Sequence, residues 1–191
     1  MWENLKAQVT SFTTRDLMTI LAMALVVFLT GYIFKPIESF LMALGLSGWW
    51  LSGFIWGILS FPGVISRHKA RKFGSATLTI LIGMFIRILM GSPMSNLLTF
   101  YALSWGLPAD IIEFLFGQKR NLWVTILAWT VAGLVTFWLC DFIFFREVYM
   151  GFYQQFGFLA ISGIHRAVGG VVCALVGWAF SKGLERVGVM D

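Results

Sequence analysis

The stretch Lys72–Pro93, KFGSATLTILIGMFIRILMGSP, carries most of the information about the fold. After Lys72 its only charged residue is Arg87, and the other side chains are apolar, small or hydroxyl-bearing. A membrane-spanning helix needs about 20 mostly apolar residues, so the stretch predicts one that ends at the helix breakers Gly91 and Pro93. An arginine exposed to lipid is costly. Arg87 is therefore expected to face the interior of a helical bundle.

The composition of the whole chain is typical of a membrane protein. Of its 191 residues, 59% are hydrophobic and 12% are charged, and the mean hydropathy is +0.84. Because a soluble domain of this length cannot hide that much apolar surface, a soluble helical bundle is disfavoured. The sequence predicts an all-α integral membrane bundle that forms one domain over residues 1–191. Six segments are expected to span the membrane: about 17–34, 41–65, 74–91, 97–117, 122–145 and 156–180.

The distribution of basic residues predicts the orientation of this bundle. With six spans both termini lie on one side, together with ten basic residues, whereas Lys35 and Arg146 lie on the other side. Lysine and arginine are enriched in cytoplasmic loops, so both termini are expected in the cytoplasm of a bacterial cell, with the chain in the plasma membrane. The basic loop 67–72 would fix this topology. The ten residues are Lys6, Arg15, Arg67, Lys69, Arg71, Lys72, Lys119, Arg120, Lys182 and Arg186.

Two basic residues, Arg87 and Arg166, fall inside the predicted spans. Charged side chains at membrane depth need partners or a wet cavity. At about 1.5 Å of rise per residue, Arg87 and Asp141 lie at similar depths, and a long side chain at Arg166 reaches the depth of Asp110. The sequence therefore gives two candidate ion pairs, Arg87 with Asp141 and Arg166 with Asp110.

Two interpretations of these charges remain open. In the first, the charges line an outward-opening polar pocket together with Trp105 and His165, which lie in the same layer. In the second, they are structural ion pairs that tie helices together. The outer segment REVYMGFYQQFG would add a pocket rim, although its tyrosines also suit an interfacial aromatic belt. The candidate substrate-binding residues are Arg87, Trp105, Asp141, Tyr153, Gln154, His165 and Arg166.

The last predicted helix carries a row of small residues on both sides of Arg166. They recur at three- and four-residue steps, a pattern that lets helices approach closely. The same row is expected to leave room beside Arg166 for another molecule. Its members are Gly163, Ala167, Gly170, Ala174 and Gly177.

Several other kinds of site are not indicated by the sequence. His, Cys and carboxylate residues do not cluster at metal-ligand spacing, so no metal or cofactor is expected. Cys140 and Cys173 lie in apolar runs and are interpreted as packing residues, and Glu113 is placed at the cytoplasmic interface. The net charge of +5 is attributed to topology rather than to nucleic-acid binding. Without a phosphate-binding loop or a nucleophile–base set, the chain is not expected to be an enzyme.

Four stretches, taken in order, are similar to one known family. KFGSATLTILIGMFIRILMGSP and then WGLPADIIEFLFG match a family segment that reads Lys-Pro-Gly-Ala-Ala, an apolar helix, Gly-x-Pro and Gln-Gly-Leu-Gly-Ala-Glu. The opening TTRDLMTILAMALVVFLTGYIF and the closing HRAVGGVVCALVGWAFSKGLERVGV resemble its first and last helices. On these motifs the chain resembles the YkoE-type substrate-binding (S) components of energy-coupling factor (ECF) transporters. The matching residues are Lys72, Gly74, Ala76, Gly91, Pro93, Gly106, Leu107 and Ala109, with Asp110 at the family's acidic position.

This resemblance implies a six-helix protein that captures a small water-soluble vitamin or precursor, of the thiamin or hydroxymethylpyrimidine type, from the outer face. Its partners would be a transmembrane coupling subunit and two cytoplasmic ATPases, which drive import. The chain departs from the family pattern at Ile80 and Arg87, where the family has glutamates, and at Trp105, where it has glutamine. An acid suits a cationic ligand, whereas arginine suits a carboxylate, a phosphate or a polar neutral ring.

Two other functions remain as alternatives to substrate capture. A self-sufficient ion-coupled carrier would be expected to show inverted internal repeats, and no convincing one is found. A purely structural membrane subunit would bind no ligand at all. In a structural subunit, alanine at Trp105 or Arg166 would leave ligand binding unchanged because there is no ligand, whereas in a capture subunit it would weaken binding.

Overall fold

The computed structural model describes residues 11–43, 57–91, 95–116, 121–142 and 158–188, and these residues form helices joined by turns, with no strand among them. The prediction of an all-α protein is confirmed. The described helices are α2 (Thr14–Ala43), α4 (Phe61–Ala70), α5 (Ser75–Leu89), α6 (Ser95–Leu115), α7 (Leu122–Thr136), its π-helical continuation η1 (Phe137–Phe142), and α9 (Phe158–Arg186).

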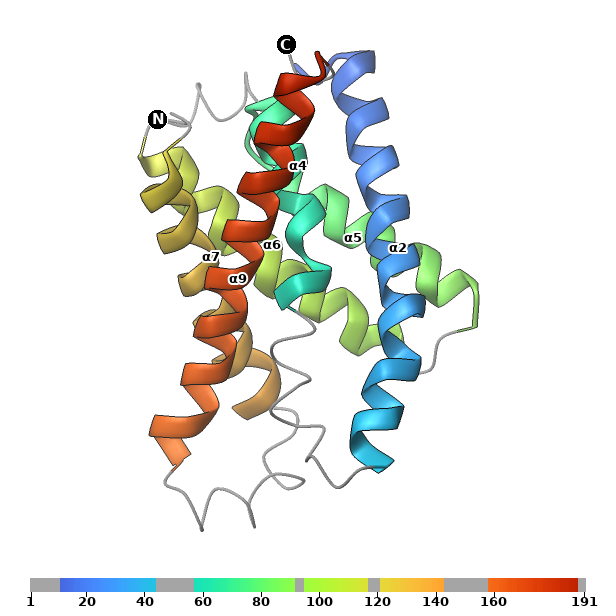
Figure 1. Ribbon diagram of the computed structural model, residues 1–191, viewed down its shortest axis with the longest axis vertical. Coiled ribbons are helices and arrows are strands. Elements are labelled where there is room, and N and C mark those ends of the chain that lie inside the picture. The colour runs from blue at the N-terminus through green and yellow to red at the C-terminus, as the bar shows by residue number, and fades with distance from the viewer. Residues whose placement is uncertain (1–10, 44–56, 92–94, 117–120, 143–157, 189–191) are drawn as a thin grey trace.

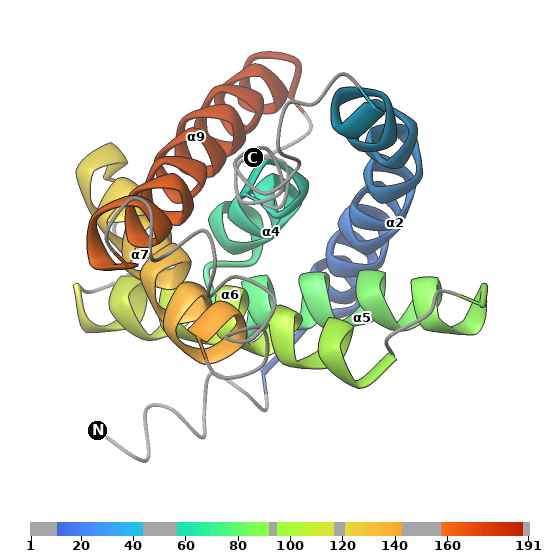
Figure 2. The same cartoon turned by 90° about the horizontal axis from the view of Figure 1, so that it is seen from below.

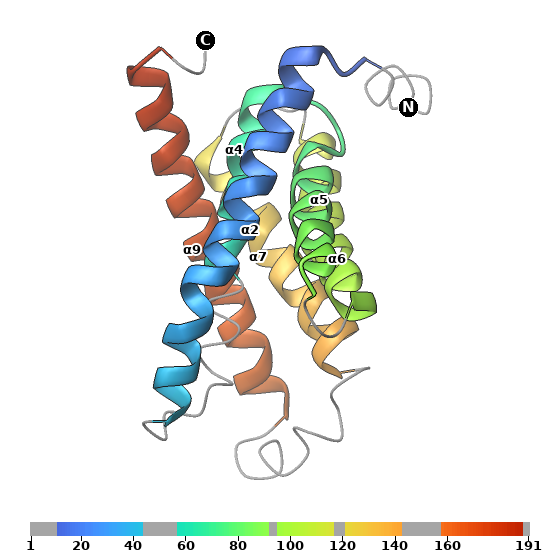
Figure 3. The same cartoon turned by 90° about the vertical axis from the view of Figure 1, so that its right-hand side faces the viewer.

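The helices form an elongated bundle in which α4 is the central element. Neighbouring helices pack in the order α2, α5, α6, α7 and α9, and α4 contacts α9, α2 and α5. Viewed along the bundle, α4 therefore lies inside an arc made by the others (Figure 2). The beginning of α2 and the end of α9 lie at the same end of the bundle, as Figures 1 and 3 show. We call this the inner end, and the opposite end the outer end.

Within the described ranges, three helical segments are long and apolar enough to cross a membrane: Thr14–Phe34, Leu122–Leu139 and Gly163–Arg186. The helix Ser75–Leu89 is apolar but shorter. On α2 large apolar side chains face outward, including Leu25 at 51% and Ile33 at 62% exposure. A continuous apolar stripe of this kind is rare on a soluble monomer and suits a lipid environment. The total of six spans and the cytoplasmic position of the termini stay predictions.

The first two helices differ from their expected bounds. The helix expected to end near residue 34 continues through Pro36 to Ala43, so residues 41–43 belong to α2 and not to the second span. Membrane helices tolerate an internal proline when neighbouring groups satisfy the freed backbone. Pro62 lies in the first turn of α4, where its missing N–H costs nothing. Helix α4 then continues past the expected end at residue 65 and stops at Arg71, which adopts a φ of 51°.

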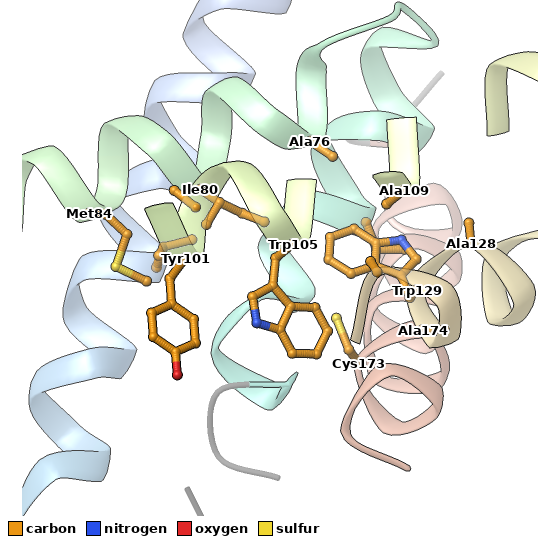
Figure 4. Packing of buried hydrophobic residues seen from close by; sticks show 14 residues of the cluster. Ala76, Ile80, Met84, Tyr101, Trp105, Ala109, Ala128, Trp129, Cys173 and Ala174 are labelled. Carbon is orange, nitrogen blue, oxygen red and sulfur yellow. The ribbon is translucent and has the colours of Figure 1, made fainter. Parts of the chain in front are cut away.

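The core is formed where α6, α7 and α9 meet α4 and α5. Trp105 and Trp129 are its largest fully buried side chains, and Cys173 is a buried packing residue beside them (Figure 4). Two glycines make this packing possible. A side chain at Gly170 would collide with the backbone of Trp129 on α7, and one at Gly177 would collide with Val64 on α4. These two members of the small-residue row of α9 therefore serve helix packing.

Candidate ligand-binding site

Tyr101 and Trp105 lie one helical turn apart on α6 and project from the same side of that helix (Figure 4). Both are buried, with 5% and 1% of their surfaces exposed. The indole Nε1 of Trp105 is a buried donor that has no hydrogen-bond partner in the described part of the chain. Burying such a donor without a partner costs free energy. The part of the chain that the structure describes therefore leaves this donor unsatisfied.

Arg166 reaches this pair of aromatic residues from α9. Its Nη2 donates a hydrogen bond of 3.0 Å to the hydroxyl of Tyr101, and its guanidinium carbon lies 5.4 Å from the centre of the Tyr101 ring. The side chain of Arg166 is buried, at 2% exposure. A guanidinium over an aromatic face is stabilised by a cation–π interaction. Arg166 and Tyr101 thus join α9 to α6 across the core.

Gly133 of α7 brings Arg166 and Trp105 together. A Cβ atom at this position would collide with the backbone carbonyl of Arg166 and would come within 3.4 Å of the Trp105 ring. Only a glycine leaves space for both at this crossing. We call Tyr101, Trp105, Gly133 and Arg166 the outer site, because they lie farther from the inner end than the charged residues described next.

Asp110 lies about one and a half turns after Trp105 on α6 and is fully buried. It accepts hydrogen bonds from the amide of Ala76 at 3.4 Å, and from the amide and the hydroxyl of Thr77 at 2.9 and 2.7 Å. These groups belong to the first turn of α5, where backbone amides have no partner within the helix. A carboxylate there also suits the positive end of the helix dipole. The predicted pair of Asp110 with Arg166 is therefore wrong, since Asp110 caps α5.

Arg67 and Glu113 are also placed differently from the prediction. Arg67 was expected in a cytoplasmic loop and Glu113 at the interface, but both are buried and the Nε of Arg67 lies 3.1 Å from Oε2 of Glu113. The same Nε lies 3.7 Å from Oδ1 of Asp110. The reason is that α4 continues through Ala70, which keeps Arg67 on a helix that packs inside the bundle. We call Arg67, Asp110 and Glu113 the inner cluster.

The inner end is closed by further polar contacts from three helices. His68 of α4 contacts the hydroxyl of Ser181 on α9 at 3.1 Å and that of Thr125 on α7 at 3.2 Å. Lys72 pairs with Asp16 at 2.9 Å, which holds the start of α2 beside the turn between α4 and α5. Most of the polar contacts of the basic stretch 67–72 are therefore made within the bundle.

Of the remaining predicted site residues, the structure describes the side chains of some and not of others. Arg87 packs its guanidinium against Gly31 of α2, and His165 is buried on α9 at 4% exposure. Asp141 lies in η1, but its side chain is outside what the structure describes, so its pairing with Arg87 stays a prediction. Tyr153 and Gln154 also lie outside the described residues.

Tyr101, which accepts a hydrogen bond from Arg166, was not among the predicted site residues. The available signal was spacing, because Tyr101 precedes Trp105 by four residues and therefore shares its helix face. The pair of Arg67 with Glu113 was not predicted either. Asp110 and Glu113 are three residues apart, a spacing that presents two carboxylates to one cation.

A separate apolar groove of about 440 Å³ lies between α6 and α7. Its walls include Leu103, Leu107 and Ile111, which are 40% exposed on the outer surface of α6, together with Val131 and Val135 of α7. The groove carries no charged side chain. None of the outer-site residues lines this groove, so it is not part of the outer site.

Comparison with known proteins identifies a similar fold. A solved structure described as the crystal structure of an S component of an ECF transporter matches with a TM-score of 0.71. The match covers 94% of this chain and 89% of that chain, at 23% sequence identity. The chain has the fold of an ECF transporter S component. No family model and no curated protein matches the sequence.

Proposed function

We propose that this protein is the substrate-capture subunit of an ECF-type vitamin importer in the bacterial plasma membrane. It binds a small water-soluble vitamin or precursor from the outer face and performs no chemistry on it. The observation that carries this proposal is the match of nearly the whole chain to the fold of an S component. The buried outer site and the apolar outer surface of α2 support it.

The outer site has the composition of a small-molecule site. It combines two aromatic rings, a buried guanidinium and an indole N–H that has no hydrogen-bond partner in the described part of the chain. Ligand pockets are mostly apolar and place a few polar groups that orient the ligand. Stacking on Trp105 or Tyr101 would hold a flat ring, and Arg166 and His165 would supply polar contacts. Arg87, Asp141, Tyr153 and Gln154 are proposed to complete this site.

Energy for transport would come from partners. A transmembrane coupling subunit would contact the bundle within the membrane, and two cytoplasmic ATPases would hydrolyse ATP. The exposed apolar face of α2 supplies a surface on which another membrane helix can pack without exposing polar groups to lipid. The proposed ligand type, thiamin or hydroxymethylpyrimidine, rests on the sequence motifs and not on the fold.

The proposal is tested by asking what the protein binds. The chain is expressed in bacteria, purified in mild detergent, and its small-molecule extract is analysed by mass spectrometry. A vitamin or vitamin precursor is expected at close to one equivalent, and titration into ligand-free protein is expected to give micromolar affinity or better. If no such compound is extracted and none binds at that level, the protein is not a capture subunit.

The two alternatives predict different outcomes of a transport assay. A self-sufficient carrier would take up the ligand in vesicles that contain this chain alone and an ion gradient. A capture subunit would need the coupling subunit and the ATPases with ATP. A purely structural subunit would bind no ligand, and Trp105→Ala or Arg166→Ala would change no affinity.

A further inference from the structure

The inner cluster brings two carboxyl groups to one cation. The Nε of Arg67 lies 3.1 Å from Oε2 of Glu113 and 3.7 Å from Oδ1 of Asp110. All three residues are buried, with 2%, 7% and 0% of their surfaces exposed. If both carboxyl groups were ionised, the cluster would hold a net negative charge inside the protein. Burying such a charge is costly, and a carboxyl group avoids the cost by binding a proton.

Among the described residues, the other neighbours of Glu113 add no second positive charge. They are Trp129 of α7 and Cys173 of α9, an indole and a thiol. The indole Nε1 of Trp129 has no hydrogen-bond partner in the described part of the chain. His68, the residue after Arg67 on α4, contacts hydroxyl groups of α7 and α9 through its two ring nitrogens. The first turn of α5 contributes only amides and a hydroxyl group.

The two carboxyl groups differ in how their oxygens are engaged. Both oxygens of Asp110 accept hydrogen bonds from the first turn of α5, where the helix dipole also favours a negative charge. In Glu113, Oε2 accepts from Nε of Arg67, whereas Oε1 is a buried acceptor with no partner among the described residues. Hydrogen bonds to an ionised oxygen stabilise the ionised form. Asp110 is therefore the ionised member of the pair.

We propose that the inner cluster is a proton-binding site, and that Oε1 of Glu113 carries this proton in the folded protein near neutral pH. Arg67 and Asp110 then form an ion pair, and the Nε of Arg67 still donates to Oε2 of the neutral carboxyl group. The cluster has no net charge in this state. The site lies apart from the outer site, and the proposal does not depend on the proposed function.

Infrared spectroscopy of the purified full-length protein tests whether the proton is present. A protonated carboxyl group has a C=O stretching band that an ionised one lacks. We expect this band at about pH 6, where glutamate in water is ionised, and we expect Glu113→Gln to abolish it. Glu185→Gln is the matched control and should keep the band, because Glu185 pairs with Lys182 near the exposed end of α9. A band that is absent from the unmodified protein, or that Glu113→Gln leaves unchanged, would overturn the proposal.

Thermal unfolding at the same pH shows which carboxyl group holds the proton. Glutamine has the shape and charge of a protonated glutamate, so Glu113→Gln should unfold at nearly the temperature of the unmodified protein. Asp110→Asn removes the charge that pairs with Arg67 and should unfold at a clearly lower temperature. If Asp110→Asn is the more stable of the two variants, or if Glu113→Gln does not fold, Glu113 is not the protonated residue.

The pH dependence of unfolding is the third test. The unfolded chain exposes Glu113 to water, where it is ionised, so unfolding releases the proton and the stability falls as the pH rises. Between about pH 5 and about pH 8, the unfolding temperature of the unmodified protein should therefore fall more than that of Glu113→Gln, which shares every other titrating group. Equal changes in both proteins would contradict the proposal. No ligand enters these measurements, so a negative result leaves the proposed function standing.

Discussion

Two of the buried polar clusters of this bundle, the inner cluster and the outer site, are assembled differently. In the inner cluster a guanidinium lies within 4 Å of two carboxylates, and one of them caps α5 with three hydrogen bonds. In the outer site a guanidinium contacts a phenol and its ring, and an indole donor has no hydrogen-bond partner among the described residues. Both places leave buried donors without a hydrogen-bond partner among the described residues, Nη1 and Nη2 of Arg67 in the inner cluster and Nε1 of Trp105 in the outer site. They differ in charge, because Arg67 faces two carboxylates whereas the hydrogen bond of Arg166 is to an uncharged phenol. The inner cluster therefore ties helices together by ion pairing, and the outer site is the one proposed to meet a ligand.

The largest expected effect is at the centre of the inner cluster. Arg67→Met keeps a long side chain but leaves Asp110 and Glu113 buried without their cation. Removing one partner of a buried ion pair typically costs about 3–5 kcal/mol. The thermal unfolding temperature of the purified protein should fall sharply, or little folded protein should be recovered.

Arg71→Met is the matched control for this substitution. Arg71 is exposed at the end of α4, four residues after Arg67. The Arg71→Met variant should unfold at the same temperature as the unmodified protein. If Arg67→Met is as stable as this control, the inner cluster does not hold α4 and α6 together.

The next effect concerns the outer site and its packing. Gly133→Ala places a Cβ against the Arg166 backbone and close to the Trp105 ring. Overpacking of a tight core costs about 1–3 kcal/mol, and here it also displaces two residues of the proposed ligand site. We expect a lower unfolding temperature and a loss of ligand affinity together.

Gly183→Ala is the control for this variant, because a Cβ at that helical position of α9 meets nothing within 4 Å. It should unfold no earlier than the unmodified chain and bind the ligand equally well. Normal affinity in Gly133→Ala would mean that the spacing of Arg166 and Trp105 does not matter for binding.

The all-α class and the common layer of Trp105 and Arg166 were predicted from the sequence, whereas the partners of Asp110 were not. The same physical reasons explain both results. Apolar runs and helix breakers locate helices, and depth along a helix placed Trp105 near Arg166. Depth does not give the direction in which a side chain points. For this reason Asp110 was paired with Arg166, although its actual partners are on α5 and α4.

The same limit applies to the stretch 67–72. A run of basic residues after an apolar segment is typical of a cytoplasmic loop, and this pattern gave the topology prediction. Only the packing of α4 inside the arc of helices shows that Arg67 and His68 are buried and that Lys72 is tied to Asp16. One polar stretch can thus contribute both an interior ion pair and a surface contact.

A smaller effect is expected at the outer site from Tyr101→Phe. The ring under the guanidinium is kept, but the hydroxyl that accepts from Arg166 Nη2 is lost. A hydrogen bond to a charged group is worth about 1.5–3 kcal/mol, part of which is regained if Arg166 turns to the ligand. Calorimetry should show a change in ligand affinity of about tenfold in either direction. An unchanged affinity would mean that Tyr101 only supports the fold.

The smallest effect is expected from Thr77→Val at the inner cluster. Valine keeps the shape of threonine and removes the hydroxyl that donates to Asp110, while the amide of residue 77 still donates. The loss of one such bond should lower the free energy of unfolding by about 1 kcal/mol. Thr19→Val is the control, because its hydroxyl bonds only to the Arg15 carbonyl on an exposed face of α2. Ligand affinity should stay unchanged in both variants, because a stability loss without a binding loss is what separates the inner cluster from the outer site.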